Sequence, residues 1–241
     1  MNTIIFKNSD EACKKASDMI CSVVKEKNDA LLGLATGGTM ENVYKYIVEE
    51  YKNKKVDFKS IRTINLDEYV GLNGDHPQSY RKYMDDRFFN HVNILKENTY
   101  VPVTTGDINK ELLRIKDIID GNKGADVQLL GVGINGHIAF NEPCDRLNAS
   151  VSVVDLDEGT IKANSRYFSS IDEVPKKAVS LGIGDILKAK KIILLAFGCE
   201  KANAIRELLK NDFITTKVPC TFLKAHNDVT VIIDEALSKE L

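Results

Sequence analysis

Two spacings of apolar residues recur along the chain and predict its elements. Short apolar runs, which are typical of buried strands, lie at Thr3–Phe6, Ala30–Leu34, Ile61–Leu66, Val127–Leu130, Lys176–Leu181, Lys191–Phe197, Thr221–Phe222 and Val229–Ile233. Apolar residues spaced by three or four positions predict helices over Ser9–Lys27, Glu41–Tyr51, Ser79–Phe89, Asp107–Asp120 and Lys201–Lys210, with a helical turn at Asp185–Ala189. We expect Ser9 to be the N-cap of the first helix.

Strands and helices alternate along most of the chain, and this order favours an α/β fold. We predict a single domain over residues 1–241 that contains a doubly wound, mostly parallel sheet of a modified Rossmann-like kind, with helices on both faces. Residues 147–174 contain few apolar positions. A long polar stretch within a compact domain is often a lid or a binding loop, so we expect a lid segment there.

Composition then narrows the class of protein. The 241 residues carry a net charge of −2, which gives no general attraction to nucleic acid or to an anionic membrane. No apolar run approaches the roughly 20 residues of a membrane span, and the N-terminal segment reaches charged residues too early for a signal peptide. Five cysteines without Cys-x-x-Cys spacing indicate reduced thiols. We expect a cytoplasmic protein that binds no nucleic acid, membrane, metal or cofactor.

The stretch richest in reactive side chains is Gly131–Pro143, which reads GVGINGHIAFNEP and follows an apolar run. It offers an amide at Asn135, an imidazole at His137 and a carboxylate at Glu142. Histidine can exchange a proton near neutral pH, and a nearby carboxylate can hold the ring in one tautomer and raise its basicity. This loop therefore indicates a site for proton transfer.

Two plainer interpretations of the loop remain open. Its three glycines, Gly131, Gly133 and Gly136, match the Gly-x-Gly-x-x-Gly pattern of dinucleotide-binding folds. That pattern has to open a helix, and Pro143 soon afterwards argues against one. The other interpretation is a structural, hydrogen-bonded histidine, but a carboxylate five residues later in a loop rich in glycine and asparagine favours function.

A second candidate site follows the second predicted strand. Residues 35–39 read Ala-Thr-Gly-Gly-Thr and lead into a helix. A strand, a glycine-rich turn and a helix present free backbone N–H groups to a phosphate, and Thr36 and Thr39 add hydroxyl donors beside Gly37 and Gly38. No lysine follows the glycines, so the turn suits a single phosphate ester better than a nucleoside triphosphate. A tight turn capped by threonine is an equally good interpretation of this segment alone.

Charged residues supply the remaining candidates. The third strand ends in Asp67 and Glu68, and because unpaired carboxylates are costly to bury, one of them is a candidate base unless the turn is solvated. Arg166 could close over an anion, or lie on the surface as a free charge. Lys201 opens a helix against the dipole trend, which indicates either a nearby anion or exposure. The ends of parallel strands share one edge of a sheet, so we expect a site for a small phosphorylated metabolite formed by 36–39, Asp67, 135–142 and Lys201.

Four motifs together resemble one family. They are LATGGT at Leu34–Thr39, NLDEYVGL at Asn65–Leu72, GHIAFNEP at Gly136–Pro143 and ANSRYF at Ala163–Phe168. In order and over nearly the full length, they are similar to the glucosamine-6-phosphate deaminases. The first motif is weak alone, whereas the second and third together are highly specific. The related 6-phosphogluconolactonases share the fold and the phosphate turn but not this pair.

The resemblance implies a cofactor-free conversion of glucosamine 6-phosphate and water to fructose 6-phosphate and ammonia, in amino sugar catabolism. It implies that Asp67 moves a proton from C2 to C1 of the opened sugar. It implies that His137 opens the sugar ring and that Glu142 orients and charges His137. The phosphate contacts that it implies are Gly37, Gly38, Thr39, Arg166 and Lys201.

Two departures from the allosteric bacterial members bear on regulation. Those members carry Asp where this chain has Asn135, and because an amide cannot exchange a proton, Asn135 can only hydrogen-bond His137 or a sugar hydroxyl. They also use Arg and Lys beyond the FNEP motif, where this chain has Ser152 and Val154, and they have a longer C-terminal tail. We expect a non-allosteric enzyme that is a monomer or a small homo-oligomer.

Three other functions are compatible with the same motifs. A 6-phosphogluconolactonase would not need Asp67 as a carbon base. A galactosamine-6-phosphate deaminase differs only in how the C4 hydroxyl of the sugar is recognised. A non-catalytic sugar-phosphate sensor usually carries a DNA-binding domain, and the sequence contains no helix-turn-helix extension or basic face.

Overall fold

A parallel sheet forms the centre of the protein. The structure is a computed structural model that describes the backbone of residues 1–241 and every side chain except that of Ala163. The sheet has seven strands in the order β1-β10-β9-β6-β2-β3-β5, and all six neighbouring pairs are parallel. Its strands are β1 (Asn2–Phe6), β2 (Leu31–Leu34), β3 (Arg62–Asn65), β5 (Thr99–Tyr100), β6 (Val127–Gly131), β9 (Ile192–Ala196) and β10 (Val229–Asp234).

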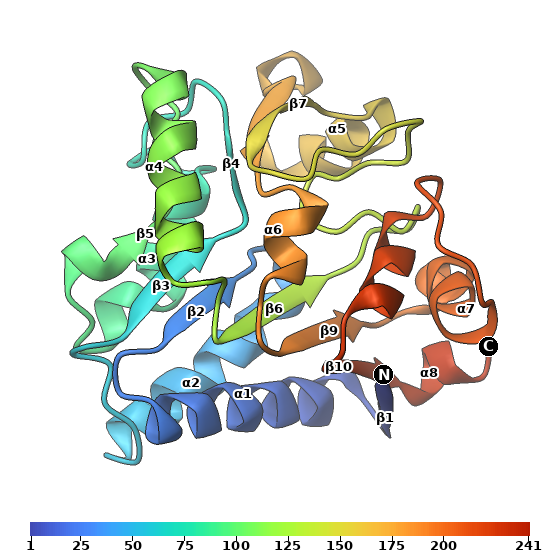
Figure 1. The fold of residues 1–241 in the computed structure, drawn as a ribbon, viewed down its shortest axis with the longest axis horizontal. Coiled ribbons are helices and arrows are strands. Elements are labelled where there is room, and N and C mark those ends of the chain that lie inside the picture. Colours follow the sequence, from blue (N-terminus) through green and yellow to red (C-terminus); the bar gives the residue numbers. More distant parts are fainter.

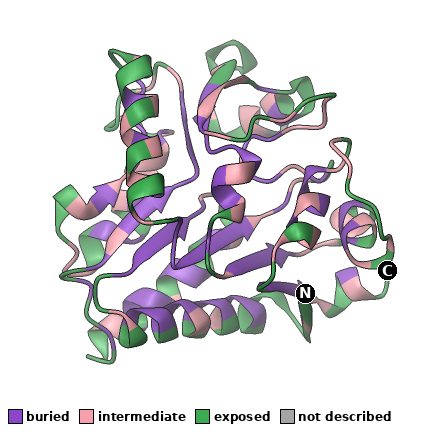
Figure 2. Ribbon diagram, in the orientation of Figure 1, coloured by how far each residue is buried: buried purple, intermediate pink, exposed green. Residues whose placement is uncertain are grey.

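Helices cover both faces of this sheet, as the alternation of elements predicted. They are α1 (Ser9–Glu26), α2 (Glu41–Lys52), α3 (Tyr80–Arg87), α4 (Ile108–Gly121), α5 (Glu158–Asn164), α6 (Ile183–Leu187), α7 (Ala202–Lys210) and α8 (Glu235–Ser238). Figure 1 shows α1 and α2 side by side below the sheet and α6 above it. The central strands are buried along their length (Figure 2), which explains why their sequences are nearly continuous apolar runs. The expected α/β fold is confirmed.

The direction of strand addition reverses between β2 and β6. From β2 the chain adds β3 and then β5 on one side, whereas from β6 it adds β9 and then β10 on the other. Ligands of open α/β sheets bind at such a switch point, outside the carboxyl ends of the strands. The turn at 36–39 follows β2 and the loop at 132–143 follows β6, so both candidate loops flank this point.

A second, antiparallel sheet lies beyond the carboxyl ends of the central strands. It contains β4 (Asp67–Tyr69), β8 (Lys177–Ser180) and β7 (Ser152–Asp155), with β8 in the middle. Figure 1 shows it, together with α5, above the central sheet. The strand that we predicted at Lys176–Leu181 therefore exists, but it does not belong to the parallel sheet. Asp67 and Glu68 are strand residues rather than part of a turn.

Two predictions of local structure were wrong. Thr221–Phe222 is not a strand, because both residues lie in a 3₁₀ helix, Pro219–Ala225, with proline in its first turn. The N-cap of α1 is Asn8 rather than Ser9, since Asn8 has an extended backbone and its side chain accepts a hydrogen bond from the Glu11 N–H. No helix in the described part of the chain is both long enough and apolar enough to cross a membrane.

Candidate active site

The loop after β6 is shaped by glycines and does not continue into a helix. Gly136 has a φ of 86°, a conformation that glycine adopts without strain. A Cβ at Gly133 would lie 2.3 Å from Cε1 of His137, so the imidazole can occupy its place only because Gly133 has no side chain. Turns and one isolated bridge, Ile138 to Asn141, follow where a dinucleotide fingerprint would open a helix. The dinucleotide interpretation is therefore excluded.

Within this loop, His137 and Glu142 form a hydrogen-bonded pair. Nδ1 of His137 lies 3.0 Å from Oε2 of Glu142, and the amide nitrogen of Asn135 donates to the same oxygen at 2.8 Å. The Asn135 side-chain oxygen accepts a hydrogen bond from the His137 backbone N–H at 3.1 Å. Burial alone would raise the pKa of Glu142, but hydrogen bonds from His137, Thr160 and Asn135 and the charge of His137 outweigh it and hold that pKa below its usual range.

Sequence reasoning missed one member of this network, Thr160 on α5. Its hydroxyl donates to Oε1 of Glu142 at 2.6 Å, and the residue is 8% exposed. Glu142 therefore accepts hydrogen bonds on both carboxylate oxygens from three different residues. No local signal identified Thr160, because a threonine in a polar segment is ordinary and its partner lies eighteen residues away.

The two carboxylates of β4 have different surroundings. Glu68 is 2% exposed and accepts hydrogen bonds from the backbone N–H groups of Tyr69, Tyr80 and Arg81 at 2.9 to 3.0 Å. Asp67 is 8% exposed, and its carboxylate has no hydrogen-bond partner among the described residues. Glu68 thus caps the start of α3, whereas Asp67 is free to meet a ligand.

Burial changes the acidity of both groups. It raises the pKa of Asp67 to about 8, with a further contribution from the neighbouring charge of Glu68. It raises the pKa of Glu68 to about 7, although the three backbone N–H groups oppose the change. A carboxyl group whose pKa lies near neutrality is well suited to accept and return a proton at physiological pH.

Strand β8 connects Asp67 with the histidine loop. Asp67 pairs with Ser180 across the small sheet, and the Ser180 hydroxyl accepts a hydrogen bond from the Phe140 N–H at 3.0 Å. The next residue, Leu181, donates its N–H to Leu66 and accepts a hydrogen bond from the side chain of Asn141. One short segment therefore holds both candidate catalytic stretches at the same edge of the molecule, as the sequence predicted.

The turn after β2 has the features of a phosphate site. Gly37 has a φ of 100°, and nothing lies within 4 Å of where a Cβ on Gly37 or Gly38 would be. A 3₁₀ turn, Gly38–Met40, then leads into α2, whose first N–H groups lack partners within the helix. Thr36 and Thr39 are half-buried beside the exposed glycines.

The turn after β9 has a similar backbone, although the carboxylate of Glu200 lies where a Cβ on Gly198 would be. Gly198 has a φ of 89°, and a 3₁₀ turn at Cys199–Lys201 leads into α7. Lys201 is half-buried, and its ammonium group forms no ion pair with a described side chain. Burial lowers the pKa of that ammonium group, against the opposing charges of Glu200 and Asp234. An anion at this edge would restore the lost solvation of Lys201.

Arg166 lies apart from these groups. It is exposed, and its guanidinium carbon lies 4.8 Å from the ring centroid of Tyr167, a cation–π distance. The structure shows no contact between Arg166 and the phosphate turn.

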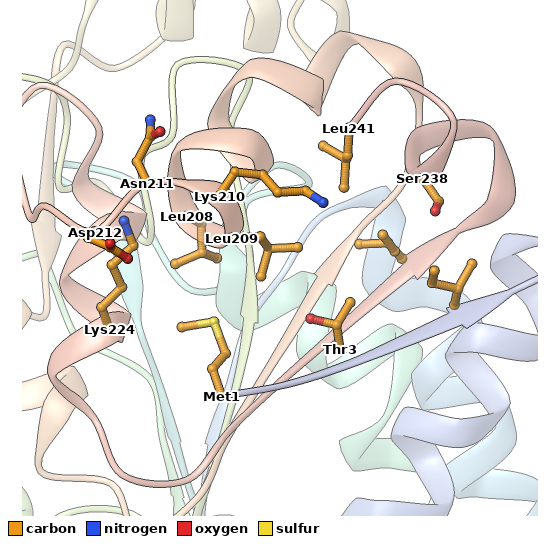
Figure 3. Close-up of a pocket in the computed structure, with 12 residues that line it drawn as sticks. Met1, Thr3, Leu208, Leu209, Lys210, Asn211, Asp212, Lys224, Ser238 and Leu241 are labelled. Atoms are coloured by element: carbon orange, nitrogen blue, oxygen red, sulfur yellow. The ribbon is translucent and has the colours of Figure 1, made fainter.

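Two other kinds of site are a metal centre and a surface groove. Among the described side chains, no group of three or more His, Cys, Asp or Glu is placed to bind a metal ion. A groove of about 580 Å³ lies beside β1 and the end of α7 (Figure 3), but no candidate site residue lines it. Met1 and Leu241 both line this groove, so it lies where the two ends of the chain meet.

The chain is similar to known proteins over almost its full length. Residues 7–232 match a family model described as glucosamine-6-phosphate isomerases/6-phosphogluconolactonase. The chain is 50% identical over 242 residues to a glucosamine-6-phosphate deaminase of Clostridium beijerinckii, and the match covers 100% of both chains. It is 49% identical over 236 residues to one from a Thermoanaerobacter species, which covers 98% of this chain and 93% of the relative.

Solved structures share the fold of this chain. A monomeric glucosamine-6-phosphate deaminase superposes with a TM-score of 0.96 at 42% identity, over 100% of both chains. A 6-phosphogluconolactonase from Trypanosoma cruzi superposes with a TM-score of 0.78 over 100% of this chain and 96% of the other. At 19% identity, that second likeness concerns the fold alone.

Proposed function

Because the chain belongs to the family of glucosamine-6-phosphate isomerases and 6-phosphogluconolactonases, we propose that it converts glucosamine 6-phosphate and water to fructose 6-phosphate and ammonia. The reaction is an aldose–ketose isomerisation with deamination, a step of amino sugar catabolism. It is favoured over the lactonase reaction because the relatives with 42% to 50% identity are deaminases, whereas the lactonase likeness is confined to the fold.

One structural observation carries the assignment. Asp67 is a buried carboxyl group with no hydrogen-bond partner among the described residues, and β8 joins its strand to the loop of the His137–Glu142 pair. Hydrolysis of a lactone needs no base that removes a proton from carbon. Isomerisation of an amino sugar needs such a base, held close to the substrate and away from water.

Ring opening is the first step, and we assign it to His137. The pair with Glu142 fixes Nδ1 as the protonated nitrogen, so Nε2 can exchange a proton with the sugar. The ring nitrogen moves a proton from the O1 hydroxyl to O5, and the C1–O5 bond breaks to give the open-chain aldehyde. Asn135 cannot exchange a proton, and its role is to hold Glu142 and the loop backbone.

Proton transfer between carbons follows, and we assign it to Asp67. The ionised carboxylate removes the proton from C2, the electrons of the C1–O1 double bond move to O1, and O1 takes a proton from the ammonium group at C2, which gives an enol with a neutral amine at C2. Asp67 then returns the proton to C1, which leaves a ketimine at C2. Water adds to this ketimine, ammonia leaves, and the product is fructose 6-phosphate.

The phosphate of the sugar supplies the orientation. We assign its binding to Thr36, Gly37, Gly38 and Thr39, with Lys201 as the cation on the neighbouring turn. Anchoring one end of a flexible sugar reduces the entropy cost of aligning C2 with the base. Arg166 joins this set only if its segment, residues 147–174, moves as a lid toward the phosphate.

The setting of the reaction is also a proposal. We infer a single-domain enzyme that works as a monomer in the cytoplasm and has no allosteric effector. A solved relative with 42% identity is monomeric, and all five cysteines are free, which is typical of a reducing compartment. Val154 and Ser152 lie on β7, where the resemblance places cationic effector contacts in allosteric members.

Ammonia release tests the proposed function directly. The purified protein is incubated with the 6-phosphates of glucosamine, galactosamine and N-acetylglucosamine, and with 6-phosphogluconolactone as the control for the alternative reaction. We expect ammonia and fructose 6-phosphate from glucosamine 6-phosphate, with deuterium at C1 when the solvent is D₂O. Faster hydrolysis of the lactone, or activity on the acetylated sugar alone, would overturn the assignment.

The choice of base has its own test. Asp67→Asn should lower kcat roughly 10³-fold or more while KM changes little, because the amide keeps the shape but cannot accept the C2 proton. Glu68→Gln is the matched control, since it disturbs the cap of α3 and should affect stability more than kcat. Ammonia release that is untouched by Asp67→Asn would refute the role of Asp67.

A further inference from the structure

The hydrogen bond from Thr160 to Glu142 joins helix α5 to the loop of the proposed proton-transfer pair. Glu142 belongs to the loop after β6, whereas Thr160 belongs to α5, inside the segment 147–174. The donor–acceptor distance of 2.6 Å is short, as expected for a hydroxyl that donates to a carboxylate. Thr160 is 8% exposed, so water does not readily replace its hydroxyl at this position.

The three hydrogen-bond donors of Glu142 are divided between its two carboxylate oxygens. His137 and Asn135 both bind Oε2, and Thr160 alone binds Oε1 among the described residues. A carboxylate held at only one oxygen can rotate about its last bond, whereas one held at both is fixed in its plane. Thr160 therefore determines how Oε2 faces the imidazole, and it helps to keep Glu142 ionised.

Contacts around α5 show how the hydroxyl is brought to Glu142. Leu156, just before the helix, is buried with Phe140 and Tyr69, and Ile161 packs against the same small cluster. Phe140 belongs to the histidine loop and Tyr69 to the strand of Asp67. The apolar contacts thus place α5 against both catalytic stretches, and Thr160 adds a polar contact to one of them.

We propose that Thr160 is a positioning residue that couples the place of α5 to the orientation of the His137–Glu142 pair. The inference rests on the proposed function of that pair. With α5 docked, the Thr160 hydroxyl fixes Glu142 and the imidazole is held for proton exchange. When α5 moves away, Glu142 loses its contact on Oε1 and ring opening slows.

Two substitutions distinguish the role of the Thr160 hydroxyl from that of its methyl group. Thr160→Val keeps the shape and removes the donor, and we expect kcat to fall roughly ten- to a hundredfold, the range for losing a hydrogen bond to a charged group, with KM little changed. Thr160→Ser keeps the donor and should restore most of kcat. Lys162→Ala, an exposed position on the same helix, is the control and should leave both constants unchanged.

A double-mutant cycle tests whether Thr160 acts through Glu142. In a Glu142→Gln background, Thr160→Val should cost much less in kcat than in the native protein, because the charged acceptor is already absent. Equal effects in both backgrounds, or a Thr160→Ser enzyme as slow as Thr160→Val, would show that the residue only fills space and would overturn the proposal.

Hydrogen–deuterium exchange gives a readout that needs no turnover. Thr160→Val should speed amide exchange within residues 158–164 of the substrate-free protein, whereas Thr160→Ser and Lys162→Ala should not. This result can be obtained even if the protein released no ammonia, so a failure of the proposed function and a failure of the coupling are distinguishable. Unchanged exchange in Thr160→Val would contradict the coupling of α5 to Glu142.

Discussion

Asp67, the proposed base, is a buried carboxyl group whose ionisation the fold opposes. Its carboxyl group is buried, lies beside Glu68 and has no hydrogen-bond partner among the described residues, so the ionised form is disfavoured. Asp126, at the opposite edge of the sheet, is buried to the same degree but receives hydrogen bonds from Lys27, Lys190 and the Leu31 N–H. These contacts outweigh its desolvation and hold the pKa of Asp126 below its usual range. The two aspartates therefore respond to pH in opposite directions.

We expect Asp67→Asn to stabilise the protein at alkaline pH. The pKa of Asp67 is about 8 in the folded protein and about 3.9 in an unfolded chain. Between these values the folded state binds more protons than the unfolded state, so the contribution of Asp67 to stability falls as pH rises and is lowest above about pH 8. Urea unfolding at several pH values should show the gain of Asp67→Asn over the native protein growing from pH 5 to 9.

Asp126→Asn is the matched control with the opposite sign. Because its folded pKa is lowered, Asp126 contributes stability above the unfolded pKa and loses it as pH falls. The variant should be less stable than the native protein at neutral pH, and the difference should shrink in acid. A gain for Asp67→Asn that does not change with pH would contradict the raised pKa of Asp67.

At the scale of elements, β8 is the part that holds the site together. It is the middle strand of the small sheet, and it contacts β4 with its backbone and the histidine loop with the Ser180 hydroxyl. Ser180 is 1% exposed, so the Phe140 N–H that it satisfies has no ready access to water. Strand β8 therefore holds the proposed catalytic groups in position.

Removing the Ser180 hydroxyl should weaken both the fold and the site. Ser180→Ala leaves the buried Phe140 N–H without its acceptor, and we expect a loss of about 1–3 kcal/mol in the free energy of unfolding. Because the loop carrying His137 loses an anchor, kcat should fall more than KM rises. Ser152→Ala is the control, since that half-buried hydroxyl bonds only the exposed Asn148. Equal, small losses in the free energy of unfolding for the two variants would argue against a role of β8 in positioning the histidine loop.

The elements that could be predicted from sequence are the strands buried on both faces and the helices with one continuous buried face. Strands β2, β6 and β9 are buried on both faces, so their sequences are apolar runs, and α1 and α4 keep one buried stripe. Strands β4, β5 and β7 are short and carry polar residues, so no periodicity marks them. Their pairing depends on tertiary contacts.

The same reasoning applies to the candidate site. The turn at 36–39 and the histidine loop could be recognised because glycines and reactive side chains gather there within a few residues. The choice between Asp67 and Glu68 could not be made from the residues, since it depends on the three N–H groups that occupy Glu68. The roles of Thr160 and Ser180 could not be predicted, because each forms its hydrogen bond with a partner distant in sequence.

At the scale of the whole molecule, the reversal of strand order brings distant residues together. Strands β9, β6, β2 and β3 are consecutive neighbours, and each is followed by one of the groups assigned to the reaction. The proposed site is therefore formed within one chain, from the edge of the central sheet and from β4 of the small sheet. No second copy is needed to complete the assigned set of residues.

A site complete within one chain should give simple kinetics. We expect the dependence of rate on glucosamine 6-phosphate to be hyperbolic and unchanged by added N-acetylglucosamine 6-phosphate, and specific activity to be independent of protein concentration. Gel filtration with light scattering should give the mass of one chain, 26.9 kDa. A sigmoidal curve that the acetylated sugar relieves would contradict this expectation.

The first strand of the chain is the edge strand β1, which hydrogen-bonds to β10, the last. During translation β1 is made before every other strand of the sheet, whereas its neighbour β10 is made after all of them. Until then its apolar residues and those of β9 lack the strand that lies between them in the finished sheet. We expect nascent chains that stop short of β10 to be recognised by chaperones or proteases, so that the cell retains few partly made copies.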